Sequence, residues 1–403
     1  MKLWMKILLG LFLGVIVGQL LPEFSVSIKP VGDMFINSIK MLIVPLIFSS
    51  LLVGIASMED TTKMGRVGAK TFGLYLLTTA LAITIGLTIG TIMKPGAGVN
   101  LGTTTNIVAK AAQPFSKTIV DIIPTNPIKS AAEGKVLQII VFALLFGISL
   151  NLAGKKGKIV IEFFDGVAEG MYKLTNMVME LAPYGVFALM AYISSIYGLA
   201  VLLPLLKVLI GVYLGCIIHA LITIGGAITF IARLNPVRFF KGIIDALAVA
   251  YSTASSSGTL PITMRCARKN LGVSDGMASF VLPLGATINM DGTAMYQGVA
   301  ALFVAQAYGI DLNFGHYITI ILTSTLASIG SAGVPGAGLI MLTLVLNSVG
   351  LPVEGIALIA GIDRVLDMAR TTVNVTGDCM VTVLVAQSEK ELDHKVYNQV
   401  ATF

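Results

Sequence analysis

The sequence DRVLDMARTTVNVTGD, residues 363–378, decides the fold class because it places charged residues in an otherwise apolar stretch. Its strongest polar residues are spaced 4, 3, 4 and 4 positions apart: Asp363, Asp367, Arg370, Asn374 and Asp378. At about 100° per residue they fall within roughly an 80° arc of one helix face. An ionisable side chain at mid-membrane costs at least ~2.5–3.5 kcal/mol, so an aligned set predicts a wet or ion-filled interior. The alternative is a set of mutually satisfied pairs between helices.

The composition of the whole chain is that of a membrane protein. Of 403 residues, 56% are hydrophobic and 12% are charged, against roughly 45–50% and about 25% in soluble domains. So few charges exclude disorder, a coiled coil and a nucleic-acid-binding surface. We therefore attribute the net charge of +6 to basic cytoplasmic loops. The cysteines Cys216, Cys266 and Cys379 have neither disulfide nor metal spacing.

Apolar stretches of about 20 residues or more predict eight transmembrane helices. They lie at residues 3–21, 34–57, 69–93, 136–153, 159–192, 199–231, 277–308 and 353–387. A signal peptide is the alternative for the first stretch, but no A-x-A-like cleavage site follows it, so we interpret it as a span. The polar residues 94–135 predict a long external loop.

Two further apolar stretches, 240–268 and 315–349, carry breaks at their centres, STASSSGTLP (252–261) and SIGSAGVPGAG (328–338). A Gly/Ser/Pro break leaves backbone groups unpaired in lipid and is tolerated only where protein or a polar cavity surrounds it. Both stretches therefore predict re-entrant helical hairpins, whose helix N-termini could bring N–H groups to a carboxylate. Close packing is the alternative for residues 255–258.

The distribution of loop charge favours this topology. If each hairpin returns to its own side, one side of the membrane holds the Lys- and Arg-rich loops 58–68, 154–158, 232–241 and 265–272. The short loops on the other side, 193–198, 309–314 and 350–352, hold no Lys or Arg. Basic loops are typically cytoplasmic. The sequence thus predicts an all-α, multi-pass plasma-membrane protein with eight spans, two hairpins and both termini inside.

Each predicted hairpin is followed by a span with an Asn-x-x-Gly motif, NMDGT at 289–293 and NVTGD at 374–378. Hairpins that enter from opposite sides make these units inverted repeats, which place a binding site near the bilayer midplane. Asn, Asp and Gly together favour local unwinding at 289–293, where carbonyls and Asp291 would supply oxygen ligands for a small cation. A kink without a ligand is the alternative. Tyr75, Thr78 and Thr79 share a helical face that could add oxygens or simply pack.

Four motifs in this order resemble the signatures of the dicarboxylate/amino acid:cation symporters, a family that includes archaeal aspartate transporters and animal excitatory amino acid transporters. They are SSSGTLP (255–261), NMDGT (289–293), GVPGAG (333–338) and the stretch 363–378. The resemblance covers nearly the whole chain and implies a homotrimer of elevator transporters. Spans one, two, four and five, within 1–234, would form a trimerisation scaffold. Spans three and six, with residues 235–403, would form the moving transport domain.

The resemblance implies Na⁺-coupled transport of an acidic amino acid, aspartate or glutamate, through a membrane-embedded site. Arg370 would bind the side-chain carboxylate, which suits its planar fork, and Asp367 would bind the amino group. The remaining substrate-binding residues implied are Asn374, Thr293, Ser256, Val334, Gly338 and Thr371.

For Na⁺, a co-transported ion rather than a catalytic cofactor, the resemblance implies three sites. The residues of the first site are Gly285, Asn289, Asn374 and Asp378. Those of the second are Thr287, Ser328, Ile329 and Ser331. Those of the third are Tyr75, Thr78, Thr79, Asn289 and Asp291.

The sequence departs from the family pattern at several positions. Ala254 and Met368 stand where archaeal and animal members respectively carry an arginine. Arg364 could supply that basic group, or it could snorkel or pair locally near the outer interface. Gln297 replaces a glutamate that is linked to proton and potassium coupling in animal members, and Ser331 replaces a threonine.

The main alternative is a proton-coupled glutamate symporter or a C4-dicarboxylate symporter of the same family. A passive anion channel is a further alternative. An intramembrane protease using Asp363 and Asp367, or Ser256, is remote because an arginine separates the aspartates and no histidine accompanies the serine. We expect a chain that is not an enzyme. Isolated, structural roles are predicted for His219, His316 and His394.

Overall fold

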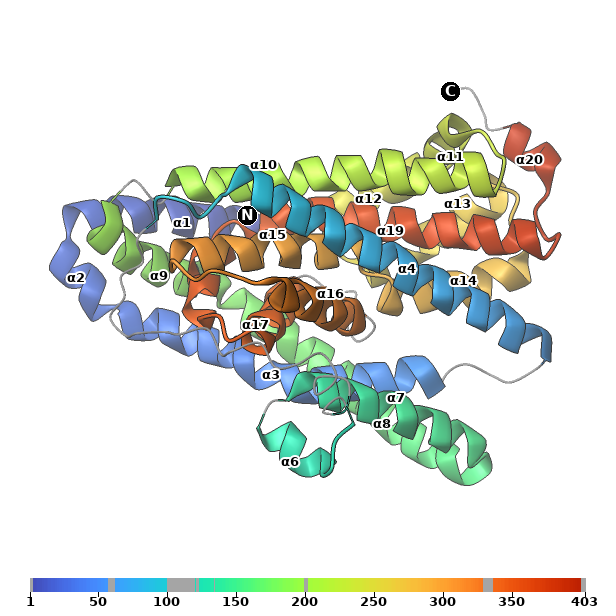
Figure 1. Cartoon of the computed structure of the whole chain (residues 1–403), viewed down its shortest axis with the longest axis horizontal. Coiled ribbons are helices and arrows are strands. Elements are labelled where there is room, and N and C mark those ends of the chain that lie inside the picture. The colour runs from blue at the N-terminus through green and yellow to red at the C-terminus, as the bar shows by residue number, and fades with distance from the viewer. Residues whose placement is uncertain are drawn as a thin grey trace.

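The computed structural model describes residues 3–56, 62–99, 120, 123–133, 135–198, 202–328 and 336–399. Within these residues the chain is helical and contains no strand, apart from an isolated β-bridge between Val273 and Leu392. The all-α prediction is confirmed. Most of the long helices run close to the longest axis of the molecule (Figure 1).

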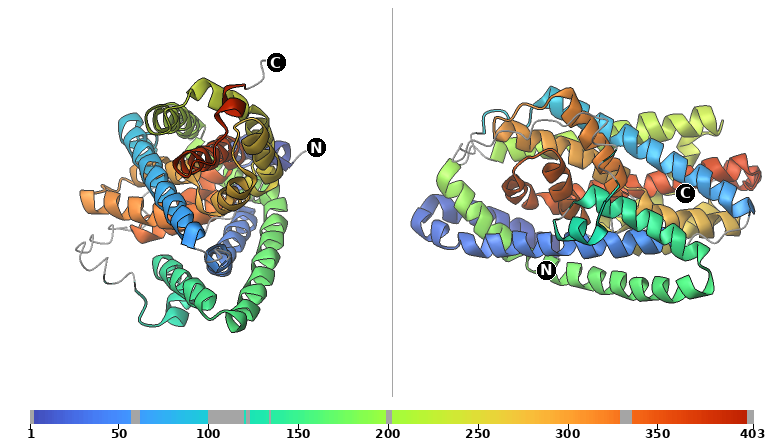
Figure 2. Two further views of the ribbon diagram at one scale, coloured as in Figure 1. Left: turned by 90° about the vertical axis from the view of Figure 1, so that its right-hand side faces the viewer. Right: turned by 60° about the horizontal axis from the view of Figure 1, so that its bottom comes forward.

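The helices form two groups. In the first group the helices pack mainly against one another, and they comprise the first, second, fourth and fifth predicted spans. Its members are α1 (Leu3–Leu20), α2 (Pro22–Ser27), α3 (Lys29–Ala56), α6 (Pro127–Ala132), α7 (Val136–Leu152), α8 (Lys155–Glu180) and α9 (Ala182–Tyr197). In Figure 2 α3, α7 and α8 lie along one side of the molecule.

Glycines on one face of α1 bring it close to α9. A Cβ added at Gly10 would lie 2.5 Å from the carbonyl oxygen of Pro183, and one added at Gly14 would lie 2.6 Å from that of Phe187. Small residues at such spacing let backbones approach closely, which is how helices associate where lipid removes the hydrophobic driving force. The pattern fits a helix pair built for a membrane.

The second group surrounds the polar stripe of residues 363–378. Its long members are α4 (Thr62–Met93), α10 (Leu202–Ile218), α12 (Ile244–Thr253), α13 (Ser256–Lys269), α14 (Asp275–Ile288), α15 (Asp291–Ala307), α16 (Phe314–Ser328), α17 (Ala337–Ser348) and α19 (Asp363–Ser388). The short helices α11 (Pro236–Gly242), α18 (Ile356–Ala360) and α20 (His394–Asn398) join them.

Both predicted hairpins form helix pairs. At the base of the first, α12–α13, the amide of Asn270 donates to the Gly242 carbonyl at 2.7 Å, so the two outer ends are adjacent. The second is α16–α17, and residues 329–335 between these two helices lie outside the described residues. Its first turn is joined to the C-terminal part of α4, since Thr91 Oγ1 lies 3.1 Å from the Tyr317 hydroxyl.

The base of the α12–α13 hairpin lies at the opposite end of α4. Arg66 and Lys70, near the N-terminus of α4, form salt bridges with Glu389, and the nearby Glu391 carbonyl accepts from the Ser274 N–H at 3.1 Å. The two hairpins therefore enter from opposite ends of the helix group, as the repeat prediction requires. Hydrogen bonds from Arg66 and Lys70 hold the pKa of Glu389 well below its usual range, at about 2.

Four predicted spans are not continuous α-helices. Residues 159–192 are interrupted at Leu181, between α8 and α9. Residues 277–308 are interrupted at Asn289–Met290, between α14 and α15. Residues 199–231 end as π-helix, at His219–Ile224 and Ala227–Ile231. Residues 353–387 break at 361–362, before α19, rather than at the Asn374 motif, which stays helical.

By length and apolar composition, residues 65–93 and 202–231 are the described helices that could cross a membrane. Shorter apolar helices include Val141–Leu152, Ala182–Ile196 and Ala337–Ser348. Breaks and polar residues divide several other predicted spans, so length alone identifies fewer of them than the sequence pattern does.

Candidate functional site

The polar stripe predicted for residues 363–378 lies on α19 and is buried. The exposed fractions are 2% for Asp363, 6% for Asp367, 0% for Arg370, 2% for Asn374 and 2% for Asp378. Burying an ion costs several kcal/mol unless good partners surround it. The partners of this stripe therefore define the candidate site.

Arg370 is the centre of the first group of partners, a buried ion-pair cluster. Its Nη1 lies 2.8 Å from Asp363 Oδ1 and its Nη2 lies 2.9 Å from Asp367 Oδ1. The guanidinium carbon lies 4.1 Å from the centre of the Tyr296 ring on α15, a cation–π contact. A Cβ added at Gly338 of α17 would lie 2.7 Å from Arg370 Nη1, so a side chain there would displace the guanidinium.

The α16–α17 hairpin reaches the same region from both sides of its tip. The Gly336 N–H donates to Asp367 Oδ2 at 3.0 Å. Gly336 has a φ of 83°, in the left-handed region that glycine adopts without strain. On the other arm, Ser328 Oγ lies 3.4 Å from the carbonyl oxygen of Ile288, at the end of α14. The hairpin therefore touches both α19 and the interruption in the predicted seventh span.

That interruption confirms the unwinding predicted from the NMDGT motif. Asn289 (φ −96°, ψ 93°) and Met290 (φ −117°, ψ 52°) leave helical geometry. Across the break, the Gly292 N–H donates to Asn374 Oδ1 at 2.8 Å. The Asn374 amide nitrogen lies 3.1 Å from Met290 Sδ and 3.4 Å from Thr293 Oγ1. Asn374, which lies on α19, thus holds the non-helical segment between α14 and α15 against α19.

Beside the break lies an oxygen cluster formed by Thr78, Thr79, Asn289, Asp291 and Asp378, each at most 4% exposed. Thr79 Oγ1 donates to Asp291 Oδ1 at 2.8 Å, and Thr78 Oγ1 lies 3.3 Å from the same atom. Asn289 Nδ2 donates to Asp378 Oδ1 at 3.0 Å. Carboxylate, amide and hydroxyl oxygens are the ligands that hard cations prefer.

The two clusters together carry an excess of buried negative charge. Asp291, Asp363, Asp367 and Asp378 oppose Arg370, which gives a net charge of −3 when all five are ionised. A low-dielectric interior tolerates such an excess only when bound cations or protons neutralise it. The arrangement is therefore suited to binding cations together with a small charged molecule.

Comparison with known proteins agrees with this chemistry. The family model described as the sodium:dicarboxylate symporter family matches residues 3–388. The chain belongs to this family. Membership makes it a transporter and not an enzyme, so the intramembrane protease alternative is excluded.

Named members of the symporter family align with nearly the full chain. The proton/sodium-glutamate symport protein of Geobacillus stearothermophilus is 39% identical over 97% of this chain and 95% of its own length. The proton/glutamate-aspartate symporter of Escherichia coli (strain K12) is 38% identical over 97% and 93%. The C4-dicarboxylate transport protein of Bacillus subtilis (strain 168) is 38% identical over 97% and 94%.

In this family member the tip of the α12–α13 hairpin also meets α19. Ser255 caps α13, its Oγ accepting from the Gly258 N–H at 3.0 Å, and Ser256 follows as a buried first residue. Arg364 Nη2 donates to the Thr253 carbonyl at 3.0 Å. Arg364 therefore pairs locally with the hairpin tip, through the carbonyl of the residue directly before Ala254.

Other predicted residues join the clusters less directly. The Tyr75 hydroxyl donates to the Val281 carbonyl at 3.0 Å rather than to a cluster oxygen. Thr371 Oγ1 reaches Asp367 Oδ1 only at 3.5 Å. Thr287 Oγ1 donates to a carbonyl of its own helix at 3.0 Å. Three predicted residues lie outside the described residues: Ile329, Ser331 and Val334.

Two partners were missed by sequence reasoning. His219 is not isolated, because its Nε2 lies 3.0 Å from Asp291 Oδ2, and both side chains are fully buried. Tyr296 lies beneath Arg370, and its position three residues after Thr293 was a usable signal of a shared helix face. No spacing could signal the His219 contact, since 72 residues separate the pair.

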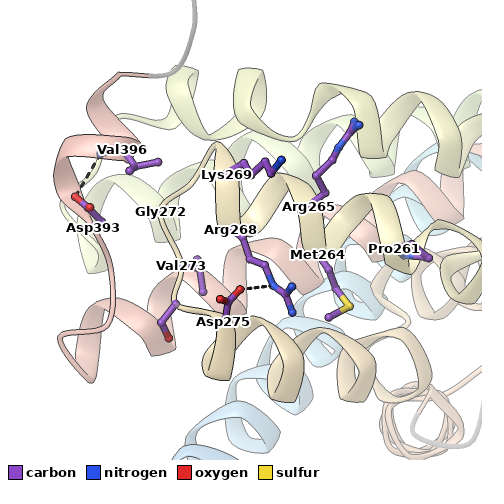
Figure 3. Close-up of a pocket in the computed structure, with 11 residues that line it drawn as sticks. Pro261, Met264, Arg265, Arg268, Lys269, Gly272, Val273, Asp275, Asp393 and Val396 are labelled. Carbon is purple, nitrogen blue, oxygen red and sulfur yellow. Dashed lines mark hydrogen bonds and ion pairs between the residues drawn. The ribbon is translucent and has the colours of Figure 1, made fainter.

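A cavity of about 660 Å³ lies away from both clusters, at the end where α13 approaches α20 (Figure 3). Arg265, Arg268 and Lys269 line it with Asp393, and no residue of the two clusters does. Asp275 partly neutralises the positive charge of this lining through a 3.0 Å salt bridge to Arg268. Buried charge, rather than this cavity, marks the candidate site.

Proposed function

We propose that the chain is a secondary active symporter that carries L-aspartate or L-glutamate together with several Na⁺ ions. The observation that carries the proposal is the buried Arg370 guanidinium, which lies between two carboxylates beside the carboxylate-rich oxygen cluster. Membership of the sodium:dicarboxylate symporter family supports it, as do the glutamate and aspartate in the names of its relatives.

Arg370 binds the side-chain carboxylate of the substrate through its planar fork. That carboxylate replaces an aspartate on the guanidinium, so binding exchanges one ion pair for another and leaves Asp367 to accept the amino group. Asn374, already held at 2.8 Å by the Gly292 N–H, bonds the α-carboxylate. The other proposed substrate-binding residues are Thr293, Thr371, Ser256, Val334 and Gly338.

Na⁺ ions bind at the three sites implied by the family motifs, and two of these draw on the oxygen cluster. Asp378 with Asn289, and Asp291 with Thr78 and Thr79, supply the ligands. Four buried aspartates against one buried arginine, a net charge of −3 when all five are ionised, support more than one cation per cycle. Each ion offsets part of the repulsion that an anionic substrate adds.

Gly285→Ala is expected to weaken Na⁺ binding by about 5- to 150-fold, the equivalent of an overpacking cost of about 1–3 kcal/mol. A Cβ there would lie 2.5 Å from the Tyr75 hydroxyl and 2.6 Å from Asp378 Oδ1. Gly276→Ala on the same helix is the matched control, because nothing lies within 4 Å of its Cβ. Na⁺ titrations of purified protein measure both. Equal Na⁺ affinity in the two variants would remove Asp378 from the cation site.

The chain spans the plasma membrane through eight helices with two re-entrant hairpins, and both termini are cytoplasmic. The helix group of α1, α3 and α7–α9 is the scaffold of a homotrimer, embedded in membrane lipid. The group around α19 is the transport domain, which carries the closed site across the membrane as an elevator. The separate packing of the two groups supports this division.

Membrane voltage favours coupling to more than one Na⁺. An acidic amino acid carries a net charge of −1, and moving it into an inside-negative cell costs about 2.3 kcal/mol per 100 mV. One Na⁺ cancels this cost, and a second turns the voltage into a driving force. Several Na⁺ ions per cycle therefore allow concentrative uptake.

A proton-coupled or C4-dicarboxylate symporter is the second candidate, because relatives with those names are almost equally similar. Asp367 argues against a C4-dicarboxylate, which has no amine for this carboxylate to bind. Gln297 argues against a proton carried at that position, because a neutral amide cannot hold one.

Uptake into proteoliposomes tests the function. An inward Na⁺ gradient at constant pH is expected to drive accumulation of L-[¹⁴C]aspartate or L-[¹⁴C]glutamate, and choline in place of Na⁺ is expected to abolish it. Succinate should compete poorly. A proton gradient that drives uptake equally well without Na⁺ would replace the proposal with its proton-coupled alternative.

A further inference from the structure

His219 lies at the point where the sixth predicted span changes its helical geometry. The α-helix of α10 ends at Ile218, and a π-helix begins at His219 and continues to Ile224. A second π-helical segment follows at Ala227–Ile231. Departures from α-helical to π-helical geometry are frequently found at functional sites. Here the π-helical segment that begins at His219 presents a fully buried imidazole to the oxygen cluster.

The Asp291 carboxylate has two distinct sides. Its Oδ1 faces Thr79, at 2.8 Å, and Thr78, at 3.3 Å. Its Oδ2 faces His219 Nε2 at 3.0 Å, from a helix that contributes no other residue to the cluster. Because a carboxylate oxygen accepts, Nε2 carries the hydrogen in this contact. The other ring nitrogen, Nδ1, is buried and has no hydrogen-bond partner among the described residues.

The contact also fixes the rotation of the carboxylate. A Cβ added at Gly377 would lie 3.0 Å from Asp291 Oδ2, so the backbone of α19 passes close to this oxygen. With Oδ2 held by His219 and confined by Gly377, Oδ1 stays against the hydroxyls of Thr78 and Thr79. A metal-binding carboxylate is commonly oriented by such an outer hydrogen bond, and removing the outer partner costs about 10- to 100-fold in metal affinity.

We propose that His219 is a positioning residue for the Asp291 cation site: its Nε2–H holds Oδ2 so that Oδ1 is oriented toward the transported cation, and it thereby sets the Na⁺ affinity of that site. The inference rests on the proposed Na⁺-coupled function and adds to it a residue outside the family motifs. The change to π-helical geometry at His219, directly after α10, then orients the imidazole toward Asp291.

The test compares His219→Gln with His219→Met. Both side chains are unbranched and similar in length, but only glutamine can donate an N–H to Asp291 Oδ2. The Na⁺ concentration that half-saturates L-aspartate binding to purified full-length protein is expected to rise about 10- to 100-fold in His219→Met. His219→Gln should recover most of the affinity. At saturating Na⁺, both variants should bind L-aspartate within about threefold of wild type, since the Arg370 cluster is untouched.

His316→Met is the matched control. This buried histidine lies in the first turn of α16, where its Nδ1 accepts from the Asn313 N–H at 3.1 Å, so its loss should leave the Na⁺ dependence unchanged. Thermal melting in detergent separates folding from binding. Equal Na⁺ affinities in the Gln and Met variants would overturn the inference, whether both match wild type or both fall, because the N–H would then be irrelevant. A wild-type protein that binds L-aspartate without Na⁺ would instead overturn the proposed function itself.

Discussion

Arg370→Ala is expected to abolish uptake of L-aspartate and to lower its binding by about 10²–10⁴-fold. The substitution removes the partner of the substrate carboxylate. It also leaves two buried carboxylates without the cation that they share. In the wild-type protein Asp363 and Asp367 lie 2.8 and 2.9 Å from the guanidinium. Breaking a buried pair by removing one member costs about 3–5 kcal/mol, which corresponds to that loss of affinity. Radiolabelled uptake into proteoliposomes and equilibrium binding measure the two effects.

Two further variants separate charge from geometry. Arg370→Lys keeps the charge but loses the bidentate fork, so it should retain a small part of the binding. Arg268→Gln removes an arginine that lines the distant cavity and should leave uptake near wild type. If Arg370→Ala folds and still accumulates L-aspartate, the ion-pair cluster is a structural element and not the substrate site.

Asp367→Asn is expected to change substrate preference rather than abolish binding. An asparagine oxygen can still accept from the Gly336 N–H, now 3.0 Å from Asp367 Oδ2, so the contact with the α16–α17 hairpin survives. The charged partner of the amino group is lost. A hydrogen bond to a charged group contributes about 1.5–3 kcal/mol, so affinity for L-aspartate should fall by about 10- to 150-fold.

Succinate, which lacks the amine, should not lose affinity in Asp367→Asn, so the ratio of L-aspartate to succinate affinity is the decisive quantity. Competition binding on purified protein at saturating Na⁺ gives this ratio. Asp275→Asn, at an exposed position, is the control. Equal losses for both ligands would assign Asp367 to the support of Arg370 alone.

The features that follow local periodicity could be predicted from the sequence. The spacing of its polar residues alone predicts the polar stripe of α19. The burial of all its members follows from the apolar residues around them. The break at Asn289 follows from the poor helix propensity of Asn, Asp and Gly in one short run. The hairpin breaks follow from Gly, Ser and Pro within apolar stretches.

Contacts between distant helices could not be predicted in this way. Whether Arg364 meets lipid or the Thr253 carbonyl depends on how α12 packs against α19, 111 residues apart. The contact between His219 and Asp291 depends on the change to π-helical geometry directly after α10. The only local signal for the helix break at 361–362 is Gly361 in an apolar run, and a single glycine is a weak signal for the end of a helix.

The net charge that enters with each L-aspartate tests the central claim most directly, namely that one buried, negatively charged site carries an acidic amino acid together with several Na⁺ ions. Proteoliposomes with a fixed Na⁺ gradient and a series of K⁺ diffusion potentials give this charge from the voltage at which uptake stops. The account predicts inward movement of at least one net positive charge per L-aspartate and faster uptake at inside-negative voltage. Electroneutral uptake, or uptake that ignores Na⁺, would contradict it.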